Sequence, residues 1–464
     1  MDVLLLNLAD LVGEGYVEKP YEPPQTGMPP LGLLYLAQVL VNNGYSVQVY
    51  DQCVTGLKNA DLLAKIKQWD PKIIGFSMCL SNYWTTSDLL KKVKAWNPNA
   101  ITVAGNYTPT FYHEKLMEAD AFDYCVLGEG EYIFLELVNK LLRYGKNDFK
   151  DIRGIVYREN GIVKSTPRPE LIKNIDEIPI PDRKLVDFNY RLQRKSSAII
   201  TSRGCPYQCR FCYFNSIMGC GWRARSVKNI IEELKMLHDQ GYKEVVFGDS
   251  SFNMSMKRTR DLAAEVRKNG LDAMEFGGDL RVDRSTDEML RLIISMNFSK
   301  ALFGIESGNQ RILDYYKKQT TIEQIKLAIK KANKWRMDVI FGSFIVGAPD
   351  ETPAEVINTL KFANKLHLSF AAFQVLSTIP ISTIYQELAE KKYFTPRDDD
   401  WKGWLYVADI SPKAVPKRIL DKLVDEAWAQ FFSSYGRIFR FVTRAITNPS
   451  YIRYMMDMFQ SARY

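Results

Sequence analysis

Short apolar runs alternate with longer amphipathic stretches through the first 145 residues. Apolar runs bounded by turn residues are typical of buried strands, and the stretches between them are typical of helices. Pro29 and Pro30 stand where the first long helix begins, a position at which a missing backbone N–H costs little. Strands are expected at residues 3–8, 47–51, 73–78, 102–105 and 124–127. Residues 1–145 are thus predicted to form a doubly wound, Rossmann-like α/β domain, with ligands at the carboxyl ends of its parallel strands.

The pattern breaks between residues 146 and 195. Residues 154–157 and 161–163 flank Glu159-Asn160 and predict a hairpin. The run Ile178-Pro179-Ile180-Pro181 is unsuited to a helix interior, because proline lacks the N–H donor. We interpret residues 146–195 as a linker between two domains.

Strand–helix alternation resumes between residues 196 and 410. Six such units predict a partial (β/α)6 barrel, an open relative of the eightfold TIM barrel, in which chemistry sits on the loops after the strands. Its strands are expected at residues 198–201, 244–248, 274–277, 301–305, 339–346 and 370–376. Residues 411–464 are amphipathic and aromatic, and they predict a C-terminal helical cap.

Composition narrows the class of protein. A chain of 464 residues, 46% hydrophobic and 25% charged, is typical of a globular protein with two or three domains. No run of eighteen apolar residues occurs, so no membrane span is expected. The first residues lack the basic region and cleavage site of a signal peptide. Seven cysteines without the spacing of a disulfide framework indicate a reducing, cytoplasmic location.

The formal net charge of +8 is mild, and the charges are interspersed. No nucleic-acid partner is therefore expected. A single basic and aromatic segment near the C-terminus is suited to docking a partner. Its arginines are Arg437, Arg440, Arg444, Arg453 and Arg463.

The strongest chemical signal is a run of three cysteines, Cys205, Cys209 and Cys212, spaced C-x3-C-x2-C. Iron–sulfur cubanes usually take four cysteine ligands, so three thiolates would leave one iron open to another ligand. One alternative is zinc, but structural zinc sites need four ligands, and the three histidines of the chain lie far from this run. A second alternative makes Cys220 the fourth ligand, although it lies beyond a loop that contains Gly219 and Gly221.

This cysteine run, placed after a barrel strand, resembles that of the radical S-adenosylmethionine (SAM) superfamily. The resemblance implies a [4Fe-4S] cluster whose open iron chelates the amino and carboxylate groups of SAM, which is cleaved to a 5′-deoxyadenosyl radical. It also implies low oxygen and an electron donor such as ferredoxin or flavodoxin.

The resemblance extends to the ends of the later barrel strands. In that superfamily a run such as Gly248-Asp249-Ser250 receives the methionine amino group. The Arg281 guanidinium is suited to a bidentate pair with a carboxylate, in which two N–H groups donate to the two oxygens. Glu306 is suited to ribose hydroxyls or the amino group, with a structural ion pair as the alternative. Further cofactor-binding candidates on these strand ends are Ser307, Gly342, Ser343 and Ile379.

A doubly wound domain before such a barrel resembles the cobalamin-binding subclass of the superfamily. Many members read Gly-Gly-x-His where this chain has Ala104-Gly105-Asn106-Tyr107, so a histidine contact is not expected there. No histidine stands in an Asp-x-His-x-x-Gly loop, and bound cobalamin is therefore expected to lack a protein histidine on cobalt. The resemblance assigns cobalamin binding to Ser77, Gly105, Asn106, Thr110, Gly128, Glu129 and Gly130.

The function implied by this resemblance is C-methylation of an unactivated carbon, with the methyl group passing from SAM by way of methylcobalamin. A protein or peptide substrate is expected, and the chain resembles the archaeal glutamine C-methyltransferases that modify methyl-coenzyme M reductase. One alternative is a radical cyclase acting on a tetrapyrrole or another small molecule. A methylthiotransferase is disfavoured because Cys53, Cys79 and Cys125 are scattered. The non-enzymatic alternative is a cobalamin or cluster sensor.

Overall fold

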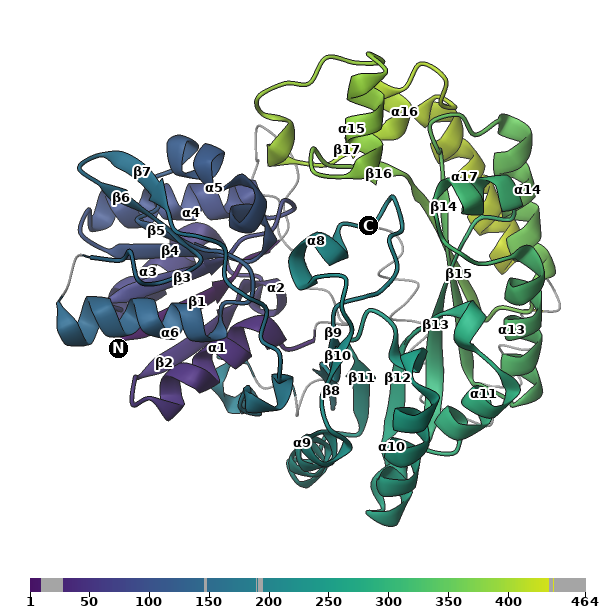
Figure 1. The fold of residues 1–464 in the computed structure, drawn as a ribbon, viewed down its shortest axis with the longest axis horizontal. Coiled ribbons are helices and arrows are strands. Elements are labelled where there is room, and N and C mark those ends of the chain that lie inside the picture. The colour runs from purple at the N-terminus through teal and green to yellow at the C-terminus, as the bar shows by residue number, and fades with distance from the viewer. Residues whose placement is uncertain (10–27, 146–147, 189, 191–194, 434–436, 438–464) are drawn as a thin grey trace. The chain divides into compact units, whose positions relative to one another are not determined.

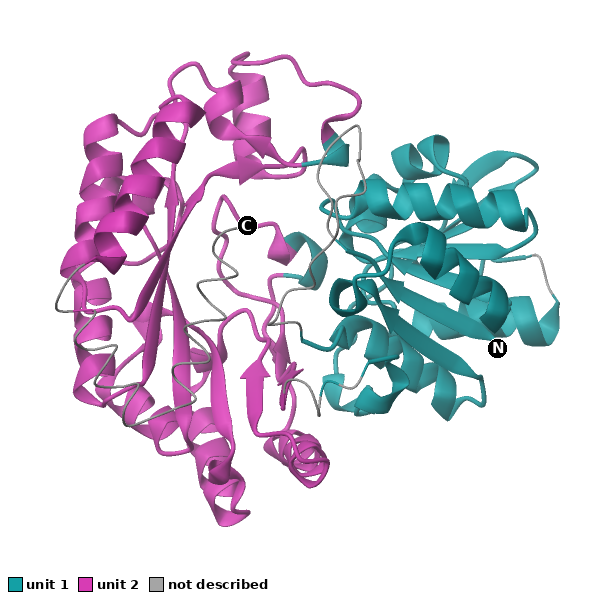
Figure 2. Ribbon diagram, turned by 180° about the vertical axis from the view of Figure 1, so that it is seen from behind, with its two compact units in different colours: residues 1–193, 216–219, 401–403 teal, residues 194–215, 220–400, 404–464 magenta. Residues whose placement is uncertain are grey.

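The computed structural model describes residues 1–9, 28–145, 148–188, 190, 195–433 and 437. These residues form two compact units, which Figure 2 distinguishes by colour. Unit 1 comprises residues 1–193, 216–219 and 401–403, and unit 2 comprises residues 194–215, 220–400 and 404–464. Among the described helices, none combines the length and the apolarity that crossing a bilayer requires.

Unit 1 is built on a seven-stranded sheet of order β2-β1-β3-β4-β5-β6-β7 (Figure 1), in which the first five strands are parallel. Residues 3–6 of β1, which lies between β2 and β3, are buried, as expected for a strand covered by helices on both faces. The doubly wound fold is thus confirmed. Its elements are β1 (Val3–Asn7), α1 (Leu31–Asn42), β2 (Val47–Asp51), α2 (Gln52–Thr55), α3 (Asn59–Trp69), β3 (Ile73–Ser77), α4 (Tyr83–Trp96), β4 (Ile101–Gly105), α5 (Tyr107–Ala119), β5 (Tyr124–Val126), α6 (Glu131–Asn139), β6 (Ile155–Glu159) and β7 (Ile162–Ser165).

The hairpin expected between the domains is present as β6 and β7, but its place differs from the expectation. Strand β6 pairs antiparallel with β5, so the hairpin extends the edge of the first sheet. Its first residues, Ile155, Val156 and Tyr157, are buried there. Joining the sheet gives β6 backbone partners on both sides and buries its apolar face, which explains why this segment is more than a connection.

A short segment from far along the chain belongs to unit 1. The Trp401 side chain is buried, and its ring lies 5.2 Å from that of Tyr83 and 5.9 Å from that of Tyr112. The Lys402 ammonium lies 5.8 Å from the ring centre of Trp84. Residues 401–403 therefore complete an aromatic cluster whose other members lie on α4 and α5.

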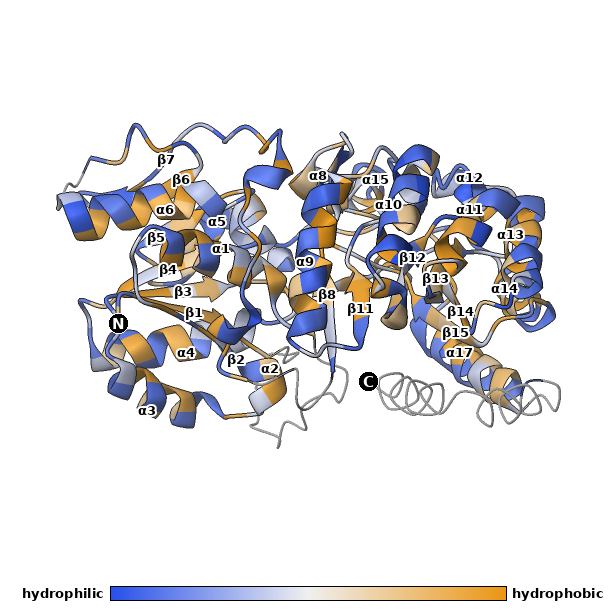
Figure 3. Ribbon diagram, turned by 90° about the horizontal axis from the view of Figure 1, so that it is seen from below, coloured by the Kyte–Doolittle hydropathy of each residue, from blue (hydrophilic) through white to orange (hydrophobic). Residues whose placement is uncertain are grey.

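Unit 2 is built on six parallel strands of order β15-β14-β13-β12-β11-β8, as the partial barrel predicts. The helices between the strands are amphipathic (Figure 3), and α14 begins with a capping box between Thr352 and Glu355. The main elements are β8 (Ser196–Ile199), β9 (Ser202–Arg203), α8 (Phe214–Met218), α9 (Val227–Asp239), β11 (Glu244–Phe247), α10 (Met256–Lys268), β12 (Glu275–Leu280), α11 (Asp287–Ile294), β13 (Phe298–Glu306), α12 (Gln310–Tyr315), α13 (Ile322–Lys334), β14 (Val339–Val346), α14 (Pro353–Lys365), β15 (Phe370–Val375), β16 (Ser377–Thr378), α15 (Thr383–Glu390), β17 (Leu405–Tyr406), α16 (Val407–Ile410) and α17 (Lys417–Phe432).

Helix α17 represents the predicted C-terminal cap within the described residues. Of the predicted docking segment, only Arg437 is described, and Arg440, Arg444, Arg453 and Arg463 lie outside. The Arg437 guanidinium donates to the Asn364 carbonyl at 2.8 Å and stacks 3.6 Å from the ring centre of Phe431. Arg437 is therefore engaged by its own chain.

Candidate functional site

The three cysteines lie on the loop between β9 and α8. Cys205 and Cys209 are half-buried, Cys212 is exposed, and the Cys212 N–H donates to the Cys209 carbonyl at 3.0 Å. Burial raises the pKa of the half-buried Cys209 thiol, the Lys318 ammonium opposes this, and the nearby Cys205 adds to the rise. The three thiols share one short loop beside the Lys318 ammonium, but their side chains are not gathered around a common point in this structure. No three His, Cys, Asp or Glu side chains in the described part of the chain are arranged to hold a metal ion.

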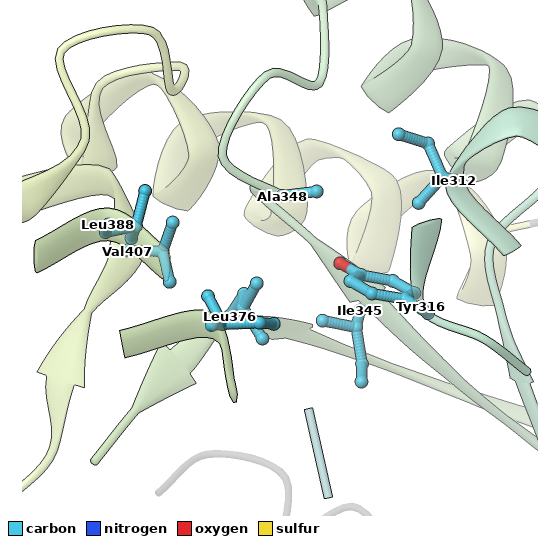
Figure 4. Close-up of a cluster of buried hydrophobic side chains, with 8 residues drawn as sticks. Ile312, Tyr316, Ile345, Ala348, Leu376, Leu388 and Val407 are labelled. Atoms are coloured by element: carbon cyan, nitrogen blue, oxygen red, sulfur yellow. The ribbon is translucent and has the colours of Figure 1, made fainter. Parts of the chain in front are cut away.

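The two residues between Cys209 and Cys212 anchor this loop. The Arg210 N–H donates to the Tyr316 carbonyl at 3.0 Å, and its guanidinium pairs with Glu387 and lies 4.4 Å from the ring centre of Tyr315. The Phe211 ring meets that of Tyr316 edge to face at 5.2 Å. Tyr316 belongs to a buried apolar cluster (Figure 4), so the loop rests on a packed core.

Asp249 holds the strand end from which the cysteine loop departs. One carboxylate oxygen accepts the N–H of Thr201 at 2.6 Å and that of Ser202 at 3.1 Å. The other accepts both hydroxyls at 2.6 Å. An ionised carboxylate accepts about four hydrogen bonds, so the acceptor capacity of Asp249 is filled by its own chain. This arrangement differs from the predicted role of receiving a methionine amino group.

Gly248 and Ser250, on either side of Asp249, also form hydrogen bonds with the segment that leads into the cysteine loop. The Gly248 N–H donates to the Ile199 carbonyl at 2.8 Å, and the Ser250 hydroxyl donates to the Gly204 carbonyl, directly before Cys205, at 3.1 Å. Residues 248–250 therefore clamp the start of the cysteine loop.

Arg281 is likewise engaged by its own chain. Its Nε donates to Asp283 at 2.9 Å, its Nη2 donates to the Lys318 carbonyl at 2.8 Å, and its guanidinium lies 3.3 Å from the ring centre of Tyr207. Arg281 thus pairs with a carboxylate of its own chain, and through Nε alone, whereas the expected pairing was bidentate.

The end of β13 carries Glu306 and Ser307, which face different surroundings. Glu306 is buried with a left-handed φ of 66° and forms an ion pair with Lys318 at 2.6 Å, the structural alternative that the sequence left open. The fully buried Ser307 hydroxyl lies 3.1 Å from that of Thr359 and accepts the Asn309 N–H. Ser307 thus secures the packing of α14, which differs from the predicted contact with a cofactor.

Of the candidates on the last strands, only Ser343 faces accessible space. A Cβ on Gly342 would lie 2.7 Å from the Leu368 side chain, so Gly342 permits close packing, and Ile379 is buried. Ser343 is half-buried and alternates with Phe341 and Ile345, so these three share one face of the sheet.

A pocket of about 770 Å³ opens on that face of β14 and β15. Phe211 and Tyr213, which flank Cys212, are among its lining residues. One face of α17 forms a side wall, where Lys417 pairs with Asp421 at 2.8 Å. The aromatic residues around the rest of the pocket are Phe341, Phe370, Phe373, Trp404, Tyr406 and Trp428. The pocket thus combines apolar walls with one ion pair and extends from the cysteine loop.

In unit 1, a hydrogen-bond network links most of the candidate cobalamin residues at the carboxyl ends of β3, β4 and β5. The Asn106 amide donates to the Ser77 hydroxyl at 3.0 Å and accepts the Tyr107 N–H at 2.7 Å. The Thr110 hydroxyl donates to the Asn106 carbonyl at 2.7 Å and accepts the Gly128 N–H at 3.1 Å. Four of the predicted residues are thereby brought together.

The remaining candidates lie on the same strand ends. A Cβ on Gly105 would meet nothing within 4 Å, so the space beside the end of β4 is open. Gly130 precedes α6, and the buried Glu129 accepts the Ile172 N–H at 2.8 Å, so Glu129 is already engaged. An open strand edge lined by small polar groups fits a large ligand bound at the carboxyl ends of the sheet.

Two acidic residues at strand ends, Asp51 and Asp279, are not among the site residues predicted from the sequence. Asp51 ends β2, is buried, and accepts hydrogen bonds from the Tyr190 hydroxyl, the Asn7 amide at 2.9 Å and the Cys53 N–H at 3.0 Å. Burial raises its pKa in spite of these bonds. Asp279 lies near the end of β12 and is accessible. A polar residue at a strand end was the available signal for both.

Comparison with known proteins gives two family matches. Residues 199–363 match the radical SAM superfamily, and residues 24–138 match the B12 binding domain. An uncharacterised methyltransferase of Pyrococcus horikoshii is 34% identical, over 87% of this chain and 88% of its own length. The anaerobic magnesium-protoporphyrin IX monomethyl ester cyclase of Rubrivivax gelatinosus is 30% identical, over 89% of this chain and 74% of its own length.

The fold is similar to that of a solved radical SAM methyltransferase, TsrM from Kitasatospora setae, with tryptophan substrate and a SAM analogue bound. The TM-score is 0.72 at 19% identity, over 84% of this chain and 76% of that chain. Another structure of TsrM has cobalamin and a [4Fe-4S] cluster bound.

Proposed function

Because this chain belongs to the family of radical SAM methyltransferases that carry a B12 binding domain, we propose that it transfers a methyl group from SAM to an unactivated carbon of a protein or peptide. The observation that carries the proposal is the presence of both domains in one chain, together with a methyltransferase relative that matches nearly its whole length. A glutamine of methyl-coenzyme M reductase is the first substrate to test.

Three groups would supply the chemistry. The [4Fe-4S] cluster would give an electron for the cleavage of SAM, and SAM would provide both the radical and the methyl group. Cobalamin would carry that methyl group. Cys205, Cys209 and Cys212 would hold the cluster, and Lys318 would offset its negative charge. Arg210 and Phe211 keep the loop on its packed core, so the three thiols are presented from a fixed position. An electron donor such as ferredoxin or flavodoxin would be the partner protein.

The pocket beside Cys212 supports the binding part of the proposal. Its volume of about 770 Å³ lies within the range of ligand sites. Phe211 and Tyr213 would face the adenosine of SAM, and the aromatic walls farther along β15 and α17 would exclude water from the reacting carbon. The pair of Lys417 with Asp421 offers both charges to an amino-acid side chain of the substrate.

The test is anaerobic purification with iron, sulfide and cobalamin supplied, followed by incubation with SAM, a strong reductant and a synthetic peptide that contains the reductase glutamine. A corrinoid absorption spectrum, formation of both 5′-deoxyadenosine and S-adenosylhomocysteine, and one added methyl group on the peptide are expected. Deoxyadenosine without S-adenosylhomocysteine would overturn methyl transfer, and a peptide left unmodified while both products form would overturn this substrate alone.

The cyclase relative supports a second candidate, a radical cyclisation of a tetrapyrrole. The two functions differ in their products, because cyclisation consumes no methyl group. With magnesium-protoporphyrin IX monomethyl ester in place of the peptide, a cyclase would form 5′-deoxyadenosine and a cyclised tetrapyrrole without S-adenosylhomocysteine.

A further inference from the structure

Asp279 projects from the face of the unit 2 sheet that also carries the Glu306–Lys318 pair. Asp279 is in register with Leu302 of β13, and Gly304 follows two residues later on that strand. A Cβ on Gly304 would lie 2.6 Å from the Glu306 carboxylate and 2.8 Å from the Lys318 ammonium. Since paired and alternate residues share a face of a sheet, the ion pair and Asp279 lie on the same side.

Three carboxylates gather there, and two of them are engaged by the chain. Asp249 accepts four hydrogen bonds from residues 201 and 202, and Glu306 is paired with Lys318. Asp279 is accessible to solvent, and within the described part of the chain its carboxylate has no hydrogen-bond or ion-pair partner. It is thus the carboxylate that remains open to a ligand.

The electrostatics of Asp279 agree with an acceptor that is open to a ligand. Surrounding protein raises its pKa to about 6, with Lys318 opposing and Asp249 and Glu306 adding to the rise. Desolvation makes the charged form of a carboxyl group costly unless a cation or a hydrogen-bond donor meets it. Lys318 acts on Asp279 and also on Cys209, so Asp279 lies near the cysteine loop.

We propose that Asp279 is the residue that receives a primary amino group at this site, in place of Asp249. Within the proposed function, which this inference deepens, two sources supply that group: the methionine moiety of SAM, or an amine of the substrate. The methionine moiety is the expected source, because the amino acid end of SAM is the part that approaches the cysteine loop in the implied chemistry.

The test measures binding, so it does not depend on turnover. Equilibrium dialysis of the cluster-reconstituted protein would use S-adenosylhomocysteine, which carries the amino acid, and 5′-methylthioadenosine, which lacks it. Hydrogen bonds to charged groups contribute about 1.5–3 kcal/mol. Asp279→Asn should therefore weaken the binding of S-adenosylhomocysteine about 10- to 100-fold and leave the binding of methylthioadenosine unchanged. Asp272→Asn, at an exposed aspartate of the same unit, is the matched control and should change neither.

A second arm identifies the source of the amino group. With S-adenosylhomocysteine bound, n-butylamine and n-butanol would be compared as probes on the wild type and on Asp279→Asn. Weaker binding of n-butylamine alone would assign Asp279 to a substrate amine. Unchanged binding of both S-adenosylhomocysteine and n-butylamine would overturn the proposal.

Two further measurements keep the result unambiguous. Asp279→Glu retains the charge and should keep part of the affinity, which guards against misfolding of the asparagine variant. Absence of methyl-transfer products from the wild type would refute the proposed function, whereas the binding difference tests Asp279 independently.

Discussion

At the scale of single residues, the site depends on which polar side chains are already hydrogen-bonded or ion-paired within the chain. Asp249 follows β11, and Asp279 lies near the end of the adjacent strand β12. The Asp249 carboxylate accepts four hydrogen bonds, whereas the Asp279 carboxylate accepts none within the described residues. Similarly, Arg281 is engaged by Asp283. The polar residues at strand ends thus divide into those that build the cysteine loop and those that remain open to a ligand.

The cysteine loop gives a direct prediction at this scale. Cys209→Ala should lose most of the bound iron and all formation of 5′-deoxyadenosine, because two thiolates hold a cubane poorly. Iron content, absorption spectrum and product analysis after anaerobic reconstitution measure this. Cys220→Ala, which removes an exposed cysteine nearby, should retain both properties. Equal loss in the two variants would make Cys220 a cluster ligand.

The sequence located the candidate residues better than it assigned their roles. The run 248–250 could be placed at a strand end, because strand ends follow from the apolar pattern. That Asp249 meets the backbone of Thr201 and Ser202 could not be foreseen, since it depends on the pairing of β11 with β8. The contact of Ser307, a predicted cofactor-binding residue, could not be foreseen for the same reason, since its partner Thr359 is 52 residues away.

At the scale of elements, the loop after β14 is held by a buried acid. The Glu351 carboxylate accepts the Gly347 N–H at 2.6 Å and the Ala348 N–H at 3.1 Å, and its second oxygen has no partner in the described residues. Burial raises its pKa to about 7, although the two N–H groups oppose this. Glu351 therefore binds its proton more tightly in the folded state than in the unfolded chain.

This loop should make stability depend on pH. A raised folded pKa means that the contribution of Glu351 is fully present below about pH 4.5 and is lost as the pH rises toward 7. Glu351→Gln keeps an acceptor oxygen and stays neutral, so its melting temperature relative to the wild type should rise between pH 5 and pH 8. Over this range the free energy of unfolding of the variant, relative to that of the wild type, should increase by up to about 3 kcal/mol.

The control is Glu390→Gln, at an exposed position on α15. The difference in melting temperature between this variant and the wild type should stay constant across the same pH range. A flat difference for Glu351→Gln as well would show that this carboxylate is ionised in the folded protein.

Elements were the level at which the sequence was most informative. Strand β14 begins and ends at the residues that the apolar pattern indicated. The hairpin of β6 and β7 was foreseen as a hairpin, but its pairing with β5 is a long-range contact that local turn residues do not encode.

At the scale of the whole molecule, each unit has its own sheet and its own candidate ligand edge. Unit 1 carries the linked residues Ser77, Asn106, Thr110 and Gly128, and unit 2 carries the cysteine loop and the aromatic pocket. Ligands that bind one folded unit should therefore stabilise that unit, in proportion to the logarithm of their concentration.

Hydroxocobalamin should accordingly raise the melting temperature of the transition that includes unit 1. At a concentration 100 times the dissociation constant, the stabilisation is about 2.7 kcal/mol, which amounts to several degrees for a unit of this size. Differential scanning calorimetry with and without the vitamin measures it. Asn106→Leu should reduce the shift and Asn99→Leu, on an exposed loop, should not. An unchanged transition in the wild type would contradict cobalamin binding by unit 1.

The presence of Trp401 in the aromatic cluster of unit 1 has a consequence for biosynthesis. The residues that form the first sheet leave the ribosome early, but the ring that packs against Tyr83 and Tyr112 emerges some three hundred residues later. Until then, the nascent first unit exposes part of an apolar surface, so its final folding step is post-translational or nearly so. A gene fragment that stops before Trp401 should therefore yield a product that depends on chaperones.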